Sequence, residues 1–483
     1  MKRLLVVVAA LGLVGTSACI RSESSQGVQA GGKPITEKTL PPCPLGALKT
    51  AKGTVDVELW EAFVGQAKEY INQLADDFNK SQSKVHVEVR SQGDSYDELL
   101  QKFQAGLASK QLPAIALVED QNLRVMVDTG AVLPAESCQR ADKSDFPVLP
   151  AVRNYYTIDD VFWPGYVDVS EPVLYYNVNH FKKAGLDSTK PPLTLDALEK
   201  TARTLKAKGV SSKPPLALKM DSWFIENWVN GAGATVVNKN NGRDGTADKA
   251  TFDNPVTHQV YEWIDEMLDE GLAQAIPDTP GNIDQYLALA QQNSTMTLET
   301  STAATTIKAF LSGDSSGVDT GGASGDLSGL VPSAGPFPGV EEPGKVRISG
   351  GAFYMTNTVA PEVQAGAWEF MKYMQTTDAQ VGWHLTGSYL PTTQAASSDP
   401  RVTSFWEDDL AGKMLKTAYE QLLEVDPAKP GPSIGPYPQY DEAVRKSLES
   451  MAFDGASPDD AIAQAQEAIQ AALTQYIEDN APN

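Results

Sequence analysis

The stretch Phe162-Trp-Pro-Gly-Tyr-Val-Asp-Val-Ser-Glu-Pro-Val-Leu-Tyr-Tyr-Asn177 contains two extended apolar segments, which flank the residues from Asp168 to Pro172. Valine, leucine and tyrosine in such runs are typical of strands. The stretch also marks a change of pattern along the chain. Before it, short apolar strands alternate regularly with helical segments, and after it helices predominate.

On the N-terminal side, three strands are predicted at residues 54–59, 85–89 and 114–118. The first two alternate apolar with polar residues, and the third is apolar throughout. Helices are predicted between them, at residues 66–78 and 96–107. Strands separated by helices indicate βαβ units and a mainly parallel sheet, so we expect the α/β class.

On the C-terminal side, helical spacing of apolar residues predicts a longer series of elements. Helices are expected at residues 195–208, 221–229, 260–268, 283–292, 301–311, 361–374 and from 458 onward, and strands at 215–218, 296–298 and 345–355. Residues 312–328 are almost entirely Gly, Ser, Asp and Thr, which predicts a surface loop. Two α/β lobes built from non-contiguous stretches fit this order best.

The N-terminus has the pattern of an export signal. Basic residues at Lys2 and Arg3 precede a short apolar run from Leu4 to Val14, and small residues lead to Cys19. We predict a signal peptide over residues 1–18, lipidation of Cys19, and a lipid anchor with a flexible tether over residues 19–50. The alternative is ordinary cleavage near this point with an unmodified cysteine.

Composition narrows the choice of partners. The net charge of −23 makes nucleic acid an unfavourable partner, because an acidic chain repels phosphate backbones.

After Cys19, the remaining cysteines are Cys43 and Cys138, and an exported chain meets an oxidising compartment. We expect them to form a disulfide, with two free thiols as the alternative. Four scattered histidines and no Cys-x-x-Cys motif give no support to a metal site, and we expect no cofactor.

Several motifs resemble one protein family. They are Pro172-Val-Leu-Tyr-Tyr-Asn177 with Phe181-Lys-Lys-Ala-Gly-Leu-Asp187, Lys239-Asn-Asn-Gly-Arg-Asp-Gly245 with Phe252-Asp-Asn-Pro255, Gly350-Gly351, and Trp383-His384 with Tyr389-Leu-Pro-Thr392. In this order they resemble family 1 extracellular solute-binding proteins of ABC importers, which are maltose-binding-protein-like, and among these the branch that binds glycerol 3-phosphate. The resemblance runs from about Val55 to Ala472.

The resemblance implies a two-lobed periplasmic-binding-protein-like fold of type II, with a ligand cleft between the lobes. Strands near residues 170–172, 294–300 and 350–351 would cross between the lobes and form the hinge. The expected division gives residues 51–168 plus 294–350 to the first lobe. Residues 169–293 plus 351–483 form the second.

The resemblance also implies a set of residues in the cleft. Carboxylate and hydroxyl groups would accept and donate hydrogen bonds to a polar solute, and a glycine would let the backbone approach it. An alternative interpretation gives these residues structural roles as helix caps, core residues or sites of strand twist. The implied cleft residues are Tyr96, Glu119, Ser170, Ser301 (or its neighbour Thr300), Gly351 and Tyr389.

Trp223 is a further cleft candidate. Phe224 and Trp228 are four residues apart and are expected to face the core, which leaves Trp223 on another face of the helix. An indole ring suits the C–H surface of a sugar or a quaternary ammonium group.

Asp441 is the departure from the family pattern that bears on the ligand. Relatives that bind glycerophosphates have an arginine after Pro-Gln-x, whereas this chain reads Pro438-Gln-Tyr-Asp441. A carboxylate there repels phosphate, so we predict a neutral sugar or a ligand with a cationic end. The alternative is that Arg445, one helical turn further on, supplies the missing cation.

We therefore predict a monomeric binding lipoprotein on the outer face of the cytoplasmic membrane, which captures a small polar solute, delivers it to a membrane permease and catalyses nothing. The enzyme alternative is a secreted glycosidase, for which Glu119, Glu171 and Glu299 would supply carboxylates. A purely structural surface protein is the third possibility. No His-Glu-x-x-His or P-loop pattern occurs in the sequence.

Overall fold

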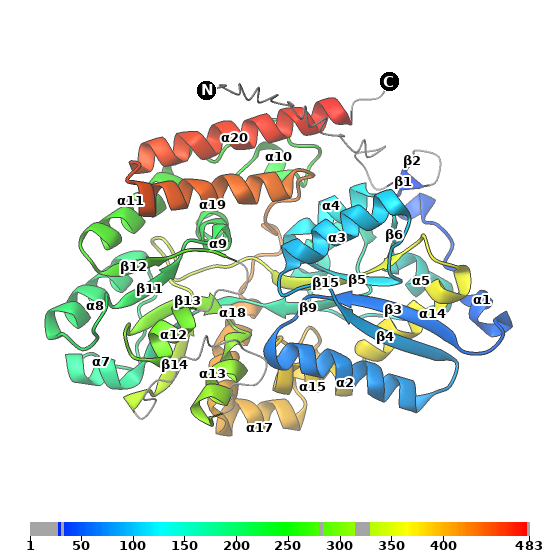
Figure 1. The fold of residues 1–483 in the computed structure, drawn as a ribbon, viewed down its shortest axis with the longest axis horizontal. Coiled ribbons are helices and arrows are strands. Elements are labelled where there is room, and N and C mark those ends of the chain that lie inside the picture. The colour runs from blue at the N-terminus through cyan, green and yellow to red at the C-terminus, as the bar shows by residue number, and fades with distance from the viewer. Residues whose placement is uncertain (1–27, 30–32, 280–283, 314–328, 481–483) are drawn as a thin grey trace, which may run out of the picture.

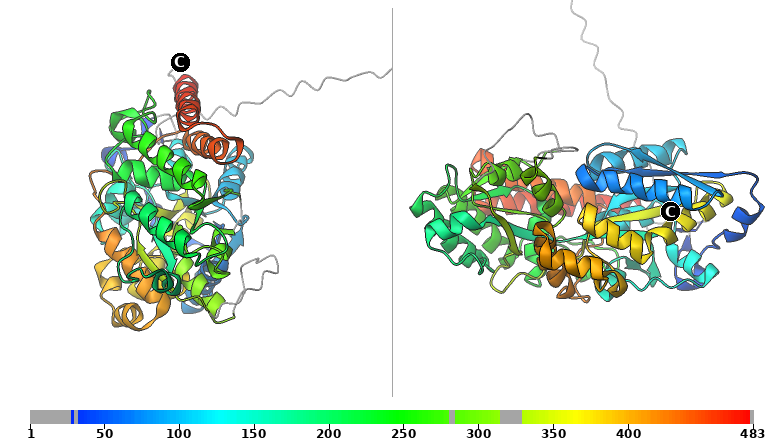
Figure 2. Two further views of the ribbon diagram at one scale, coloured as in Figure 1. Left: turned by 90° about the vertical axis from the view of Figure 1, so that its left-hand side faces the viewer. Right: turned by 90° about the horizontal axis from the view of Figure 1, so that it is seen from below.

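A computed structural model describes residues 28–29, 33–279, 284–313 and 329–480. The predicted signal peptide and the lipidation of Cys19 lie outside these residues. The chain forms two α/β lobes that lie side by side along the long axis of the molecule (Figures 1 and 2). Of the helices in the described ranges, none has both the length and the apolar character needed to span a bilayer.

The first lobe is built on a mixed sheet. β3 pairs in parallel with β4 and β5, and β15 pairs antiparallel with β5, β6 and β9. β3 buries Val55, Val57 and Leu59 and exposes Asp56 between them, which confirms the predicted alternation. The strands are β3 (Val55–Glu61), β4 (Val85–Ser91), β5 (Ile115–Glu119), β6 (Val132–Leu133), β9 (Tyr166–Ser170) and β15 (Ser349–Thr356).

Helices cover both faces of this sheet (Figure 1). The helix predicted at residues 66–78 buries Tyr70, Leu74 and Phe78 on one stripe, as its spacing indicated. The C-terminal half of the chain returns to this lobe, because α14 packs on β3 and α15 packs on α2. The helices here are α1 (Leu45–Thr50), α2 (Gly65–Ser81), α3 (Tyr96–Ser109), α4 (Leu123–Asp128), α5 (Ala135–Asp142), α6 (Pro150–Tyr155), α14 (Pro361–Met374) and α15 (Thr377–Gly387).

The second lobe has a five-stranded sheet in the order β12-β11-β13-β10-β14. β11 is parallel to β12 and β13, whereas β10 is antiparallel to β13 and β14. Every residue of β10 is buried, which explains the apolar run from Pro172 to Tyr176. The strands are β10 (Pro172–Asn177), β11 (Leu216–Lys219), β12 (Ala273–Ile276), β13 (Met296–Thr300) and β14 (Pro332–Pro336).

Most remaining helices pack around this second sheet or against the helices that cover it. α19 and α20 pair with each other and pack on α9 and α11, whereas α18 packs on β14 and α13. These helices are α7 (Val178–Ala184), α8 (Leu195–Lys208), α9 (Ser222–Gly231), α10 (Asn238–Asn241), α11 (Pro255–Asp269), α12 (Asp284–Ala290), α13 (Ala303–Leu311), α16 (Gln394–Ser397), α17 (Pro400–Asp408), α18 (Leu410–Leu423), α19 (Tyr437–Asp454) and α20 (Pro458–Asp479). Short strands β1 (Val28–Gln29), β2 (Lys33–Pro34), β7 (Thr157–Ile158) and β8 (Val161–Phe162) complete the set.

Strand pairing differs from the division of the chain expected from the sequence. The expectation placed residues 294–350 in the first lobe and 351–483 in the second. Instead β13 and β14 flank β10 in the second sheet, and β15 joins the first sheet. Residues 294–300 therefore do not cross between the sheets. The chain crosses at Ser170–Pro172, as expected, and again between β14 and β15.

Residues 35–50, which were assigned to the predicted tether of residues 19–50, pack on the first lobe. Ile35 is buried, and α1 packs against α14 and α5. Cys43 and Cys138 form a disulfide, which confirms the predicted pairing and joins the N-terminal segment to α5. The covalent link adds to this packing in holding the segment on the first lobe.

Candidate ligand-binding site

A cavity of about 570 Å³ lies between the lobes and collects polar and aromatic side chains from both. A shallower hollow along α20 is lined mostly by one face of that helix. Six of the eight predicted cleft residues line the interlobe cavity: Tyr96, Glu119, Ser170, Trp223, Tyr389 and Asp441. The other lining residues are Asp94, Ser95, Asp97, Asp120, Gln121, Lys219, Asp221, Ser222, Asp278, Thr279, Glu299, Thr300, Thr302, Gly350 and Arg445.

Two tyrosines form the first-lobe wall of the cavity. Tyr96 is the first residue of α3, where Ser95 caps the helix by accepting a hydrogen bond from the backbone N–H of Glu98. The hydroxyl groups of Tyr96 and Tyr389 lie 3.3 Å apart. Burial raises the pKa of both phenols, so both remain protonated and can donate to a solute.

Tyr389 is held from behind by a buried aromatic cluster. Its ring stacks on Trp383 with 5.3 Å between the centroids. Its carbonyl oxygen lies 2.9 Å from Nδ1 of His384, whose Nε2 accepts from the indole N–H of Trp406 at 2.8 Å. Since Nε2 is the acceptor, the ring proton is on Nδ1 and is donated to Tyr389. These contacts hold the tyrosine in place at the cavity wall.

Glu119 and Ser170 lie at the ends of two first-lobe strands. Glu119 closes β5, and Ser170 closes β9 directly opposite Ser349 of β15. Burial, and then the neighbouring carboxylates of Asp120 and Asp97, raise the pKa of Glu119 well above its usual range. A hydrogen bond to a solute would lower the free-energy cost of burying this carboxyl group.

Trp223 and Asp441 form part of the opposite, second-lobe wall. The side chain of Asp221 caps α9 by accepting from the backbone N–H of Trp223 at 2.9 Å. The indole N–H of Trp223 donates to Oγ of Ser349 at 2.9 Å, which fixes the ring orientation. Phe224 and Trp228 are buried, as their spacing predicted.

Asp441 of α19 accepts a hydrogen bond from the Ser222 hydroxyl. Burial raises the pKa of Asp441 to about 7, and the carboxylates of Asp221, Asp97 and Asp278 add to the increase. A partly buried acid with a pKa near 7 thus lies at this point of the cavity wall.

Two predicted cleft residues do not line the cavity. Oγ of Ser301 accepts from the backbone N–H of Glu171 at 3.2 Å, so it joins the ends of β10 and β13, and its neighbours Thr300 and Thr302 face the cavity instead. Gly351 lies behind Tyr96. A Cβ atom there would lie 3.0 Å from the Tyr96 hydroxyl and 2.7 Å from Oδ1 of Asp168. This glycine makes room for the tyrosine, whereas Gly350 lines the cavity.

The sequence prediction missed a charged group on the second lobe. Nζ of Lys219 lies 2.7 Å from Oδ1 of Asp278 and 3.1 Å from Oδ2 of Asp221. Burial raises the pKa of Asp278 to about 6, and Asp221 adds to this, while Lys219 opposes it. Lys219 ends β11, and the carboxyl ends of parallel strands are where ligands bind in α/β sheets. That rule could have identified it.

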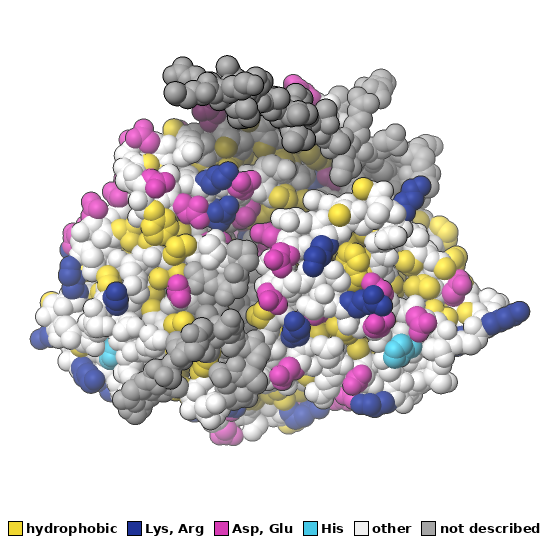
Figure 3. Space-filling view, in the orientation of Figure 1, with side chains coloured by type: hydrophobic (Ala, Val, Ile, Leu, Met, Phe, Trp, Pro, Cys, Tyr) yellow, Lys and Arg dark blue, Asp and Glu magenta, His cyan; other side chains and the backbone are white. Residues whose placement is uncertain are grey.

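Carboxylates outnumber cations around the cavity. Its cationic side chains are Lys219 and Arg445, and both are already paired, because Nη1 of Arg445 lies 2.9 Å from Oε1 of Glu449. Acidic side chains also lie along the border between the lobes on the face shown in Figure 3. The cavity is therefore suited to a solute that is neutral or carries positive charge.

Comparison with known proteins identifies the family. The sequence model of the bacterial extracellular solute-binding proteins matches residues 73–411, which is more than half of the chain. The sn-glycerol-3-phosphate-binding periplasmic protein UgpB of Brucella abortus (strain 2308) is 27% identical over 406 residues, covering 81% of this chain and 87% of that protein.

Solved structures share the fold. UgpB from Mycobacterium tuberculosis, in complex with glycerophosphocholine, aligns with a TM-score of 0.73 and 18% identity over 88% of this chain and 100% of its own. The GacH receptor of Streptomyces glaucescens, solved unliganded and with acarbose, aligns with a TM-score of 0.71 and 19% identity over 88% and 100%. These findings confirm the predicted two-lobed fold and solute-binding function and give no support to the glycosidase alternative. The chain belongs to the bacterial extracellular solute-binding proteins.

Proposed function

We propose that the protein captures a small polar solute in the interlobe cavity, closes over it by a hinge motion and delivers it to the permease of an ABC importer. The cavity is of the size that suits a small-molecule ligand. Its Tyr96, Tyr389 and Trp223 offer ring faces, and its hydroxyl and carboxyl groups offer hydrogen bonds. Two lobes that each contribute one wall are the arrangement that hinge closure requires.

The observation that carries the choice of solute is the pairing of both cavity cations. A phosphate monoester such as glycerol 3-phosphate needs a free arginine or lysine, but Lys219 is held by two aspartates and Arg445 by Glu449. Asp441 adds a carboxylate beside them. We infer a solute that is neutral overall, such as a sugar or glycoside, or one that has a cationic end.

The named ligands of relatives cover this range. The Brucella abortus protein is named for glycerol 3-phosphate, whereas the Mycobacterium tuberculosis and Streptomyces glaucescens structures contain glycerophosphocholine and acarbose. A choline group would gain from an acidic wall and from the indole face of Trp223. The charge around the cavity favours the last two types of ligand over the first.

We further propose that Cys19 carries a lipid anchor on the outer face of the cytoplasmic membrane, and that the protein acts as a monomer without catalytic activity. The order of basic, apolar and small residues before Cys19 supports the anchor. Replacement of Cys19 by serine should move the protein from the membrane fraction to the soluble fraction. Retention of the variant in the membrane fraction would contradict lipidation.

A thermal-shift screen followed by calorimetry tests the choice of solute. The purified protein is mixed with maltotriose, glycerol, glycerophosphocholine or glycerol 3-phosphate at pH 7.5. A solute at a hundred times its dissociation constant adds about 2.7 kcal/mol to the free energy of unfolding. We expect maltotriose or glycerophosphocholine to stabilise the protein, and glycerol 3-phosphate not to. Stabilisation by glycerol 3-phosphate alone would contradict the role given to Asp441 and indicate Arg445 as its phosphate ligand.

A further inference from the structure

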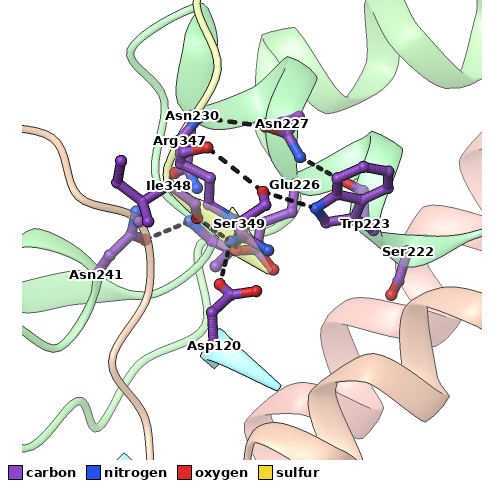
Figure 4. Close-up of polar contacts among 12 residues, drawn as sticks. Asp120, Ser222, Trp223, Glu226, Asn227, Asn230, Asn241, Arg347, Ile348 and Ser349 are labelled. Atoms are coloured by element: carbon purple, nitrogen blue, oxygen red, sulfur yellow. Dashed lines mark hydrogen bonds and ion pairs between the residues drawn. The ribbon is translucent and has the colours of Figure 1, made fainter. Parts of the chain in front are cut away.

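Arg347 lies where the two lobes meet, on the connection between β14 and β15 (Figure 4). Its side chain is 1% exposed. Nη1 lies 2.5 Å from Oδ2 of Asp120, which follows the first-lobe strand β5, and Nε lies 2.5 Å from Oε1 of Glu226, which belongs to the second-lobe helix α9. One buried guanidinium group is thus shared by an acid from each lobe.

Gln121 connects this guanidinium to the cavity. Its amide satisfies its neighbours in one orientation, in which the nitrogen lies 3.1 Å from each carboxylate oxygen of Glu119 and the oxygen lies 2.8 Å from Nη2 of Arg347. The Tyr437 hydroxyl is 3.1 Å from the same amide oxygen, but its single proton is donated to Oε2 of Glu226 at 2.7 Å. The amide is therefore held by Arg347 and donates to Glu119.

Glu119 depends on this contact for its orientation. Within the described part of the chain, Gln121 is the side chain found to donate to the Glu119 carboxylate. Burial first, and then the like charge of Asp120, Asp97 and Asp441, raises the pKa of Glu119. A carboxylate repelled by its neighbours and held by one amide would take another rotamer if the amide were removed.

We propose that Gln121, held in place by Arg347, is a positioning residue that fixes the Glu119 carboxylate in the cavity and connects it to the residue shared by both lobes. The inference rests on the proposed function, because that function makes Glu119 a solute-contacting group. The inference also connects the solute site to the contact between the lobes. Glu119 accepts from Gln121, Gln121 accepts from Arg347, and Arg347 is paired with Glu226 of the second lobe. Each link is a hydrogen bond or an ion pair, and such contacts are strongest away from water; Gln121, Arg347 and Glu226 are buried, and Glu119 is half-buried.

A double-mutant cycle tests whether Gln121 acts through Glu119. The dissociation constants of maltotriose and glycerophosphocholine are measured by calorimetry for wild type, Gln121→Met, Glu119→Gln and the double variant. We expect Gln121→Met to weaken binding of the recognised probe about tenfold in the wild-type background, and less than about twofold when Glu119 is already replaced. Arg347→Lys retains the charge but cannot supply the same set of donors, so it should weaken binding in the same way.

Gln139→Met is the matched control, because Gln139 is also a buried glutamine but lies on α5 away from the cavity. It should leave the affinity unchanged. An equal loss of affinity from Gln121→Met in both backgrounds would mean that Gln121 contacts the solute directly, which would overturn the positioning role.

Crystal structures of ligand-free wild type and Gln121→Met provide a test that needs no solute. We expect the Glu119 carboxylate to leave its wild-type position in the variant. If it remains in place, the inference is wrong. If wild-type protein binds none of the probes, the proposed function fails on that point, and this comparison still decides whether Gln121 positions Glu119.

Discussion

The two walls of the cavity differ in what they offer a solute. The first-lobe wall presents the paired hydroxyl groups of Tyr96 and Tyr389, backed by the Trp383 ring. The second-lobe wall presents Lys219 between two aspartates and Asp441 at the start of α19. Both walls carry carboxyl groups, but among the described lining residues the cations Lys219 and Arg445 belong to the second wall, where burial also raises the pKa of Asp441 to about 7.

We expect the aromatic and the carboxyl side chains of the cavity to have different roles in recognition. Aromatic rings and hydroxyl groups are compatible with many polar solutes, so the tyrosines of the first wall should supply affinity without much discrimination by charge. The carboxyl groups should discriminate by charge, because a phosphate monoester placed beside Asp441 would meet like charge.

The largest expected effect comes from removing the buried guanidinium group of Arg347, which joins an acid of each lobe. Arg347→Met leaves the carboxylates of Asp120 and Glu226 buried without their cation, which should lower the free energy of unfolding by about 3–5 kcal/mol. Urea denaturation at pH 7.5 measures this. Arg401→Met, which removes an exposed arginine with two surface partners, should cost less than about 1 kcal/mol. Equal losses in the two variants would contradict a special role for Arg347.

Removing the ring of Tyr389 tests the first wall. Tyr389→Ala should weaken binding of whichever probe stabilises the protein by about 30- to 100-fold, because a buried aromatic contact contributes about 2–3 kcal/mol. Calorimetric titration measures the loss. Tyr373→Ala removes a partly buried tyrosine of α14 that stacks on Phe370, and it should lower stability without changing the affinity. A similar loss of affinity in both would mean that the wall has no specific role.

Asp441→Asn tests the second wall through pH. Folding raises the pKa of Asp441 from 3.8 to about 7. Between these pH values the folded state keeps a proton that the unfolded state has lost. The free energy of unfolding therefore falls as pH rises from about 4 through about 7. The full displacement corresponds to at most about 4 kcal/mol, and since solvent reaches Asp441 from the cavity we expect roughly half of this. The variant should therefore gain about 2 kcal/mol over wild type at pH 8 and little at pH 4.

Chemical denaturation of the ligand-free proteins at both pH values provides the measurement. Asp97, Asp221, Asp278 and Arg445 face the same group and remain unchanged in the variant. The exposed Asp426→Asn serves as the control and should show the same difference from wild type at both pH values. A constant difference for Asp441→Asn would mean that this carboxyl does not titrate near neutral pH.

The fold was largely predictable because its elements are set by local patterns. Alternation in Val55, Val57 and Leu59 and the four-residue spacing of Tyr70, Leu74 and Phe78 each require a particular backbone period. The assignment of β13, β14 and β15 to sheets was not predictable in the same way. Pairing between strands far apart in sequence depends on long-range packing, which no local period records.

The site was predictable where motifs match the family, and less so elsewhere. Tyr96, Glu119 and Tyr389 were found through the resemblance and line the cavity. The pairing of Lys219 with Asp278 joins residues 59 positions apart by number, and no spacing rule connects them. Gly351 was misassigned to the lining because a glycine that lets a backbone approach a ligand and one that makes room for a tyrosine look the same in sequence.

The smallest expected effect concerns the bond that joins the walls at Trp223. Ser349 belongs to β15 of the first lobe, yet its Oγ accepts from the indole N–H of Trp223 on α9 of the second. Ser349→Ala removes that acceptor, and one hydrogen bond contributes about 1 kcal/mol, so the affinity for the recognised probe should fall about fivefold. Calorimetry measures it against Ser447→Ala, which removes an equally buried serine whose partner is the Tyr261 hydroxyl.

Ser447 lies away from the cavity on α19, so its replacement should cost a similar amount of stability and leave the affinity unchanged. If Ser349→Ala also leaves the affinity unchanged, Trp223 is oriented by packing on Phe224 alone, and the second wall recognises the solute independently of the first. A fivefold loss would mean instead that Ser349 of the first lobe fixes the orientation of Trp223 in the second. Recognition would then depend on how the two lobes are positioned at the hinge, and the two walls would act as one site.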